Sequence, residues 1–186
     1  MVTEQQLQNI TNTFRDELGD DDIKKYIRGF ISYKYLSEKI ALDCEMILQP
    51  ARMNFSELDE DSSTGQEYIE ILRETALDTR GYFLKPSEMF TEMVRRGNAD
   101  GKSQFILDDL TKLLSYVSEK TTGSESKEDF DHQFEGIDLK SSTLGEDENS
   151  KNDFIVKLLS HVDEIDLIVD DYGAEILDDV YDYLKD

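Results

Sequence analysis

The sequence predicts a single all-α, multi-helix domain, and three observations support this fold class. The 186 residues include only two prolines and ten glycines, so few positions interrupt a helix. Apolar residues recur at spacings of three and four over several long segments, which is the period of one helix face. The chain is 38% hydrophobic, and a domain of this length buries about 70% of the surface that its unfolded chain exposes. A packed core is therefore expected.

Two long helices are expected in the first quarter of the chain, over residues 3–18 and 22–48. Gly19 separates them, and the acidic residues 20–22 favour the start of the second helix. Pro50 marks the end of the second helix. The first helix carries the apolar residues Leu7, Ile10 and Phe14, and the second carries a stripe of Phe30, Tyr33, Leu36, Ile40, Cys44 and Ile47.

Shorter elements are expected in the remaining chain, with helices at residues 66–77, 86–95, 102–119, 152–162 and 174–183. Residues 54–65 are polar and predict a loop, and residues 82–84 predict a short extended segment. An irregular connection is expected around residues 121–149, which are rich in Ser, Thr, Gly, Asp and Glu. Isolated apolar residues should hold this connection to the core, namely Phe130, Phe134, Ile137 and Leu139. The core-facing residues of the middle helices are predicted to be Tyr68, Ile69, Leu72, Ala76, Phe105, Ile106, Leu110, Leu113, Leu114 and Val117.

The charge balance limits the possible partners. Forty-three acidic residues and twenty basic residues give a net charge of -23. Such a surface repels phosphate and anionic lipid, which argues against general nucleic-acid or membrane-surface binding by the isolated chain. No apolar segment approaches the roughly 20 residues needed to span a bilayer, and no signal peptide is recognised. Cys44 is the single cysteine, so no intramolecular disulfide forms and a cytoplasmic location is expected.

Two segments resemble functional loops but lack essential residues. Residues 97–103 end like a phosphate-binding loop, but Arg96 stands where the first glycine is required, and a helix is expected where a buried strand should precede it. In the same region, a calcium-binding loop would have Arg96 at its first position and Leu107 at its twelfth, where acidic ligands are needed. A turn between two helices explains the segment better.

Reactive side chains also suggest no catalytic site. Cys44 lies on the apolar stripe and is expected to be a buried hydrophobe. His132 and His161 have no histidine or cysteine at metal-ligand spacing. The many carboxylate pairs are most simply solvated helix surface. The sequence therefore predicts no catalytic, metal-binding or cofactor-binding residue in this chain.

Two small groups of basic residues are candidates for contact with DNA or a partner. The first group is Lys24, Lys25 and Arg28, and the second is the arginine pair Arg95 and Arg96. The alternative is that these residues pair with the abundant carboxylates, and that the arginine pair favours a helix C-terminus.

Several segments, in order along the chain, resemble type I restriction–modification DNA methyltransferase subunits. Residues 27–39 are similar to a long helix near the start of those subunits, with an apolar run before Lys-Tyr-Leu-Ser-Glu-Lys. Residues 81–86 resemble the family's aromatic–apolar–proline entry to a short helix. Residues 134–145 resemble its Phe-x-x-Ile-Asp-Leu-x-Ser … Leu-Gly segment, and residues 178–184 resemble its Asp-x-Tyr-Glu-Tyr-Leu helix. The resemblance covers nearly all of the chain.

The resemblance implies a division between this chain and a catalytic part. The parent subunits transfer a methyl group from S-adenosylmethionine to adenine N6, using a Phe-x-Gly-x-Gly loop and an Asn-Pro-Pro-aromatic motif, and neither motif occurs here. Residues 1–186 are therefore expected to form one N-terminal helical domain that is not itself an enzyme, with S-adenosylmethionine belonging to the absent catalytic domain.

The implied partners are the specificity subunit, a second modification subunit and the restriction subunit, with DNA contacted only in the full complex and no membrane. The five basic residues are the candidates for such contacts. The alternative is a standalone acidic protein, a DNA mimic or antirestriction-like protein. This alternative explains the charge, but it does not explain the family-like order of the segments.

Overall fold

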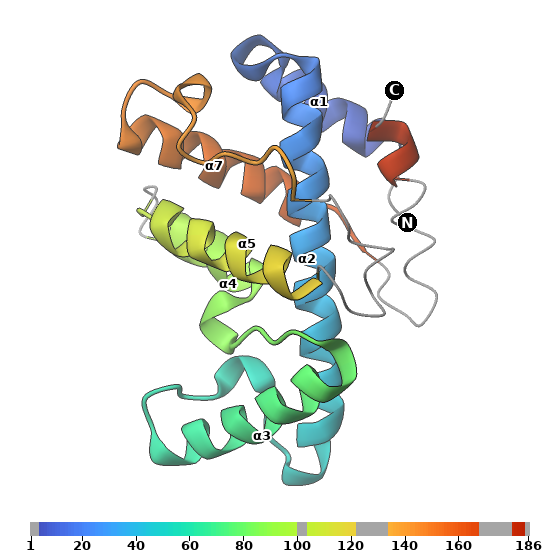
Figure 1. The fold of residues 1–186 in the computed structure, drawn as a ribbon, viewed down its shortest axis with the longest axis vertical. Helices are drawn as coiled ribbons and strands as arrows, with labels where there is room; N and C mark the ends of the chain where they lie inside the picture. Colours follow the sequence, from blue (N-terminus) through green and yellow to red (C-terminus); the bar gives the residue numbers. More distant parts are fainter. Residues whose placement is uncertain (1–3, 100–103, 122–133, 168–179, 185–186) are drawn as a thin grey trace.

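The computed structural model describes residues 4–99, 104–121, 134–167 and 180–184, and in these residues the fold is helical without β-strands (Figure 1). The prediction of an all-α fold is confirmed. The chain begins with α1 (Glu4–Leu18) and α2 (Asp20–Leu48), separated by Gly19 as predicted. None of the described helices is long and apolar enough to cross a membrane.

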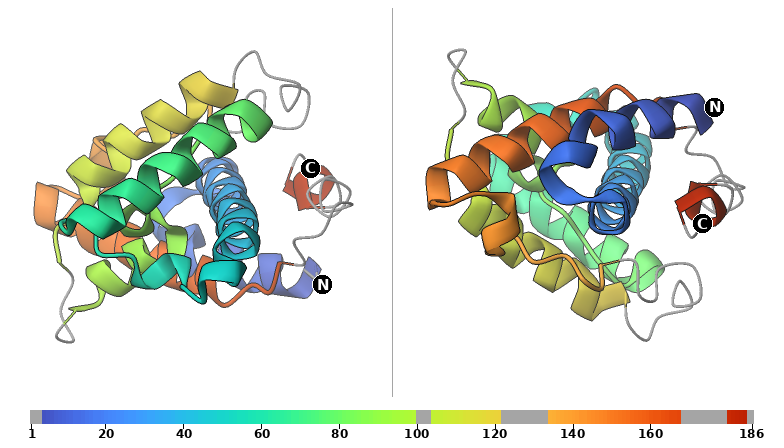
Figure 2. Two further views of the ribbon diagram at one scale, coloured as in Figure 1. Left: turned by 90° about the horizontal axis from the view of Figure 1, so that it is seen from below. Right: turned by 90° about the horizontal axis from the view of Figure 1, so that it is seen from above.

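Helix α2 is the central element of the fold. It runs along the length of the molecule (Figure 1). Four helices contact it, namely α1, α3 (Ser63–Arg80), α4 (Phe90–Gly97) and α7 (Glu148–Asp163). Viewed along α2, the helices α3, α4, α5 (Leu107–Thr121) and α7 lie to one side, whereas residues 180–184 lie on the other (Figure 2). Consecutive residues such as Phe30 and Ile31 are both buried, although they point about 100° apart on a helix. Neighbouring elements therefore cover more than one face of α2.

The last turns of α2 depart from the predicted stripe. Cys44 and Leu48 are buried, but Ile47 retains an exposed fraction of 43%. The prediction that Ile47 faces the core is wrong, because Cys44 and Leu48 occupy the side of these turns that the neighbouring elements cover. Pro50 then lies in the short 3-10 helix η1 (Gln49–Ala51).

The loop predicted over residues 54–65 is shorter and more ordered than expected. It contains the 3-10 helix η2 (Phe55–Glu57), and helix α3 (Ser63–Arg80) begins three residues before the predicted start. The Ser62 side chain accepts a hydrogen bond from the Gly65 N–H at 3.0 Å, so Ser62 caps the helix and sets its first residue.

The predicted helix over residues 86–95 is split in two. Pro86 opens the 3-10 helix η3 (Pro86–Glu88), and α4 (Phe90–Gly97) follows after Met89. The Ser37 hydroxyl of α2 accepts a hydrogen bond from the Phe90 N–H at 2.7 Å, which satisfies an N–H group at the start of α4. The segment before Pro86, residues 82–84, is buried and free of helix, as predicted.

Helix α5 (Leu107–Thr121) begins five residues after the predicted start, at residue 102. Residues 104–106 precede it outside any helix, because a side chain of α7 binds their backbone. Phe105 consequently has an exposed fraction of 46%, and the prediction that it faces the core is wrong. Ile106 is buried as predicted.

The last part of the chain contains the 3-10 helix η5 (Ser142–Leu144), α7 (Glu148–Asp163) and helical residues 180–184. The irregular connection is held to the core, since the Tyr26 hydroxyl donates a hydrogen bond to the Asp138 carbonyl oxygen at 2.8 Å. Within it Leu139 is buried, and Phe134 and Ile137 are partly buried against the core. Phe130, His132 and most of the helix predicted at residues 174–183 lie outside the described residues.

Candidate functional site

The first group of basic residues, Lys24, Lys25 and Arg28, lies on the first turns of α2, as predicted, and we call it the α2 basic cluster. Lys25 is exposed and forms an ion pair with Asp22 at 2.8 Å. Lys24 is half-buried and has no ion pair within the described residues. Arg28 is also half-buried, and its Nε atom is buried without a hydrogen-bond partner in the described part of the chain. Two of the three cations are therefore not neutralised by a described neighbour.

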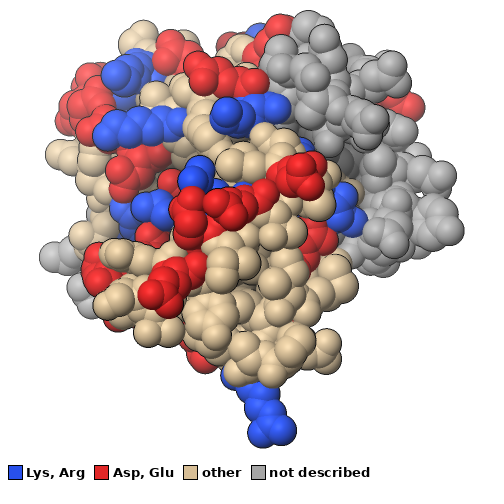
Figure 3. All heavy atoms as spheres, turned by 60° about the horizontal axis from the view of Figure 1, so that its bottom comes forward, with Lys and Arg blue, Asp and Glu red and all other residues tan. Residues whose placement is uncertain are grey.

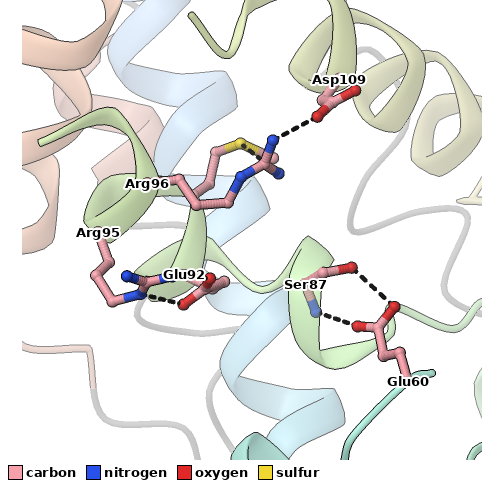
Figure 4. A network of polar contacts seen from close by, with 7 residues as sticks. Glu60, Ser87, Glu92, Arg95, Arg96 and Asp109 are labelled. Atoms are coloured by element: carbon pink, nitrogen blue, oxygen red, sulfur yellow. Dashed lines mark hydrogen bonds and ion pairs between the residues drawn. The ribbon is translucent and has the colours of Figure 1, made fainter. Parts of the chain in front are cut away.

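Arg95 and Arg96, which we call the α4 arginine pair, are both bound to carboxylates (Figure 4). The Nε and Nη2 atoms of Arg95 each donate a hydrogen bond of 2.6 Å to the Glu92 carboxylate, although the Arg95 side chain remains 69% exposed. These hydrogen bonds hold the pKa of Glu92 below its usual range. Arg96 bridges α4 and α5, since its Nη2 atom donates to Asp109 at 2.5 Å. Ion pairing, the alternative considered for these residues, is thus confirmed for Arg95 and Arg96.

The structure does not join the two basic groups. The first group lies at the start of α2 and the second on α4, and no hydrogen bond or ion pair among the described residues connects them. In the view of Figure 3, Lys and Arg side chains alternate with Asp and Glu and form no continuous basic patch. Contact with DNA by these residues therefore stays a prediction.

The segment that resembles a phosphate-binding loop has a structural explanation at its first glycine. Gly97 is the last residue of helix α4, whereas a phosphate-binding loop follows a buried strand. The prediction of a helix at this position is confirmed. A Cβ atom at this position would lie 2.9 Å from Cγ2 of Val156, so glycine permits the close approach of α4 and α7. Residues 100–103 lie outside the described part of the chain.

The reactive side chains occupy structural positions. Cys44 is buried, and desolvation raises the pKa of its thiol to about 12, so it stays protonated near neutral pH. The His161 ring packs edge-on against Phe14 with centroids 5.5 Å apart. Within the described ranges, no three His, Cys, Asp or Glu side chains are placed to hold a metal ion.

Sequence reasoning missed a buried lysine that joins three helices. The Lys34 side chain is only 5% exposed, and its Nζ atom donates to the Asp163 carbonyl oxygen at 2.7 Å. The same ammonium lies 3.7 Å from Glu38 and 5.8 Å from the centre of the Phe90 ring. Lys34 thereby links α2, α4 and the end of α7. No local pattern marks this burial in the sequence, because the residues one turn later, Ser37 and Glu38, are also polar.

Sequence reasoning also missed a cleft of about 420 Å³ between α2, η2, η3 and α4, which we call the acidic cleft. Its apolar wall consists of Ala41, Phe55, Leu58, Pro86 and Met89. Its charged lining consists of Glu45, Glu60, Glu92 and Arg95.

Two carboxylates of the acidic cleft are held by backbone groups. Glu60 accepts hydrogen bonds from the Ser87 N–H at 2.6 Å and the Ser87 hydroxyl at 3.1 Å (Figure 4). Burial raises the pKa of Glu60, but the hydrogen bonds from Ser87 and Lys85 outweigh it and hold the pKa below its usual range. Glu45 accepts a hydrogen bond from the Phe55 N–H at 2.8 Å. Both side chains therefore have fixed positions at the cleft.

The fold and the sequence together identify the family. Residues 3–162 match the family described as HsdM N-terminal domain, and the chain belongs to this family.

Relatives of known function are subunits of type I restriction–modification enzymes. The chain is 25% identical over 187 residues to the type I restriction enzyme MpnII methylase subunit of Mycoplasma pneumoniae, and the match covers 97% of this chain and 34% of that protein. It also superposes, with a TM-score of 0.69 and 25% identity, on the crystal structure of a type I restriction-modification methyltransferase subunit from Streptococcus thermophilus. That match covers 98% of this chain and 37% of the other. The chain thus spans about a third of the length of these relatives, and the resemblance inferred from the sequence is confirmed.

Proposed function

We propose that this chain is the non-catalytic N-terminal domain of a type I restriction–modification adenine-specific DNA methyltransferase subunit, and that it contributes to subunit assembly and to closure around DNA. The observation that carries this proposal is the family match over residues 3–162, together with two methylase-subunit relatives that are about three times longer. A standalone acidic DNA mimic is not favoured, because both relatives are methylase subunits.

Methyl transfer is assigned to a catalytic domain and to no residue of this chain. S-adenosylmethionine supplies the methyl group in such a reaction, but the glycine-containing loop and the Asn-Pro-Pro-aromatic motif expected to hold cofactor and adenine do not occur in the 186 residues. The residues present therefore do not fit the cofactor. Their contribution is to make surfaces for other subunits, with the specificity subunit, a second modification subunit and the restriction subunit as the proposed partners.

Any DNA contact by this domain should be local and should depend on the rest of the complex. A net charge of -23 opposes binding of the isolated domain to phosphate, and the α4 arginine pair is engaged by carboxylates. Two cations of the α2 basic cluster have no described ion pair, so this cluster is the better candidate of the two.

The test begins with the reading frame beyond the codon for Asp186 in the source genome. If the frame continues into the two catalytic motifs, the complete subunit is purified with its specificity subunit, with and without residues 1–186. We expect the deletion to reduce both the mass of the complex and the transfer of labelled methyl groups to adenine, and the separate chain to restore them when added. Unchanged complex mass and methylation after the deletion would refute the proposed role. A stop codon after Asp186 would instead favour the standalone acidic protein.

A further inference from the structure

The acidic cleft has an apolar wall that a ligand could cover. Phe55, Leu58 and Met89 are largely buried side chains that border a cavity of about 420 Å³. A cavity of this size is within the range of side-chain and ligand pockets. The cleft can thus admit a long side chain, whose alkyl part would contact the apolar wall.

Exposed apolar residues lie directly beside the cleft. Five large apolar side chains are exposed in the described residues, and three of them, Leu42, Met46 and Ile47, lie in the last two turns of α2. Leu42 and Met46 are 43% and 60% exposed, and each follows by one residue a side chain that lines the cleft, Ala41 or Glu45. Successive helix residues point about 100° apart, so Leu42 and Met46 form a ridge along the border of the cleft.

Charged residues flank this ridge on the same helix, since Lys39 and Asp43 lie one turn before Leu42 and Met46. The ridge is therefore a narrow apolar strip on a charged surface, and its two side chains are among the few large apolar ones exposed in the described residues.

The charged residues that line the cleft favour a ligand with a positive charge. Among the described residues that line the cleft, Glu45, Glu60 and Glu92 are acidic and Arg95 alone is basic. Lys85 stands outside this lining and offsets part of the charge of Glu60, since its Nζ atom lies 3.2 Å from Oε2 of Glu60. Arg95 is 69% exposed and anchored to Glu92 alone, so a competing cation can displace it at small cost. Glu45 and Glu60 keep their positions through hydrogen bonds from backbone N–H groups.

We propose that the acidic cleft and the Leu42–Met46 ridge together form a docking site for a helical segment of a partner protein that presents a Lys or Arg side chain beside an apolar stripe. The apolar stripe covers Leu42 and Met46, and the cation enters the cleft between Glu45 and Glu60. This inference rests on the proposed function, in which the domain contacts other subunits. DNA does not fit the site, since its phosphates would face carboxylates. A second copy of this acidic chain does not fit either, because like charges would oppose each other.

The experiment uses two designed peptides labelled with fluorescein. The first is an amphipathic helix with a leucine stripe flanked by arginines, and the second has glutamate in place of each arginine. Binding to the full chain is measured by fluorescence anisotropy at low ionic strength. We expect the arginine peptide to bind and the glutamate peptide not to bind.

Matched variants separate docking in the cleft from general attraction to an acidic protein. The double variant Glu45→Gln with Glu60→Gln keeps an oxygen acceptor at each position, and it should weaken binding of the arginine peptide about tenfold. The control variant Glu67→Gln with Glu74→Gln removes the same two charges from the exposed face of α3, and it should change affinity by about twofold or less. Thermal melts of both variants verify that they are folded.

Two further variants test the geometry. Met46→Ser should weaken binding about fivefold, whereas Ile71→Ser, at a similarly exposed position on α3, should leave it unchanged. Arg95→Ala removes the competing cation and should strengthen binding about threefold.

Three results would overturn the proposal: no binding of the arginine peptide, equal losses in the two glutamine pairs, or weaker binding by Arg95→Ala. A separate measurement tests the proposed function, namely binding of the purified specificity subunit to the wild-type chain. If the proposed function is wrong, this subunit does not bind the wild-type chain. If that subunit binds wild type and the Met46→Ser variant equally well, the assembly role survives and the docking site is refuted.

Discussion

Substituting Asn152 with leucine should destabilise the domain by about 2–4 kcal/mol, because this side chain ties α7 to the segment before α5. Asn152 is 2% exposed. Its Oδ1 atom accepts a hydrogen bond from the Ile106 N–H at 2.8 Å, and its Nδ2 atom donates to the Gln104 carbonyl oxygen at 2.7 Å. One side chain thus satisfies two backbone groups 46 and 48 residues away in sequence.

The magnitude follows from what each backbone group loses. The Ile106 N–H is buried and would be left without a partner, at a cost of about 1–3 kcal/mol. Gln104 is exposed, so its carbonyl oxygen can bind water and contributes about 1 kcal/mol at most. Leucine branches at Cγ as asparagine does but is larger, so no cavity forms and overpacking adds to the loss.

Urea unfolding followed by circular dichroism measures this difference, with Asn149→Leu as the control. Asn149 lies in the first turn of the same helix and is exposed, so its substitution should change the free energy of unfolding by about 0.5 kcal/mol or less. Equal unfolding midpoints for the two variants would refute the role given to Asn152. Asn152→Asp adds a sign test: burial raises the pKa of the new carboxyl above its unfolded value of about 3.9, so the variant should be destabilised at pH 7 and recover below about pH 4.

Four other predictions address packing, reactivity, pairing and binding. Gly97→Ala should cost about 1–3 kcal/mol in thermal melts, and less in combination with Val156→Ala, because its Cβ atom would meet the Val156 methyl groups at 2.9 and 3.2 Å. Cys44 should react with a thiol reagent at pH 8 only when urea unfolds the chain, and fast labelling of the folded protein would contradict this. Because the pKa of the Cys44 thiol is raised in the folded state, the thiol of the unfolded chain ionises first, and the free energy of unfolding should fall from about pH 9 towards pH 12. A double-mutant cycle on Asp43 and Arg80, joined by hydrogen bonds of 2.7 and 3.1 Å, should give a coupling of about 1 kcal/mol that decreases with salt. Alanine at all three positions of the α2 basic cluster should weaken DNA binding by the full complex at low salt. The slope of the logarithm of the binding constant against the logarithm of the salt concentration should fall by about 0.9 per lost phosphate contact, and unchanged affinity would exclude such contact.

The sequence could predict the helices because their apolar periodicity is local. The apolar stripe of α2 is visible from residues three and four apart, and the turn at Gly19 from a single position. The structure contains the turn, and it buries the stripe from Phe30 to Cys44. The start of α5 could not be predicted this way. Residues 104–106 stay out of the helix because Asn152, far along the chain, binds their backbone, and no local pattern reveals such a partner.

Burial of polar residues was similarly hidden in the sequence. A helix with one apolar stripe is expected to expose its other faces, so Lys34 and Ser37 would be assigned to solvent. Both are buried because α4 and α7 also pack against α2. The acidic cleft was missed for a related reason, since Glu45, Glu60 and Glu92 come from three separate elements and look like ordinary surface acids in a chain with 43 of them.

The central position of α2 has a mechanical consequence. Its 29 residues extend over about 43 Å, and α1, α3, α4 and α7 are all packed on this one rod. The α3 end and the α1 end therefore cannot rotate independently of each other. If a partner rotates α2 by about 10° around a pivot at its α3 end, the opposite end of this helix moves by about 7 Å, given the helix length of about 43 Å. A small rotation at one end of the domain therefore becomes a larger displacement at the other end.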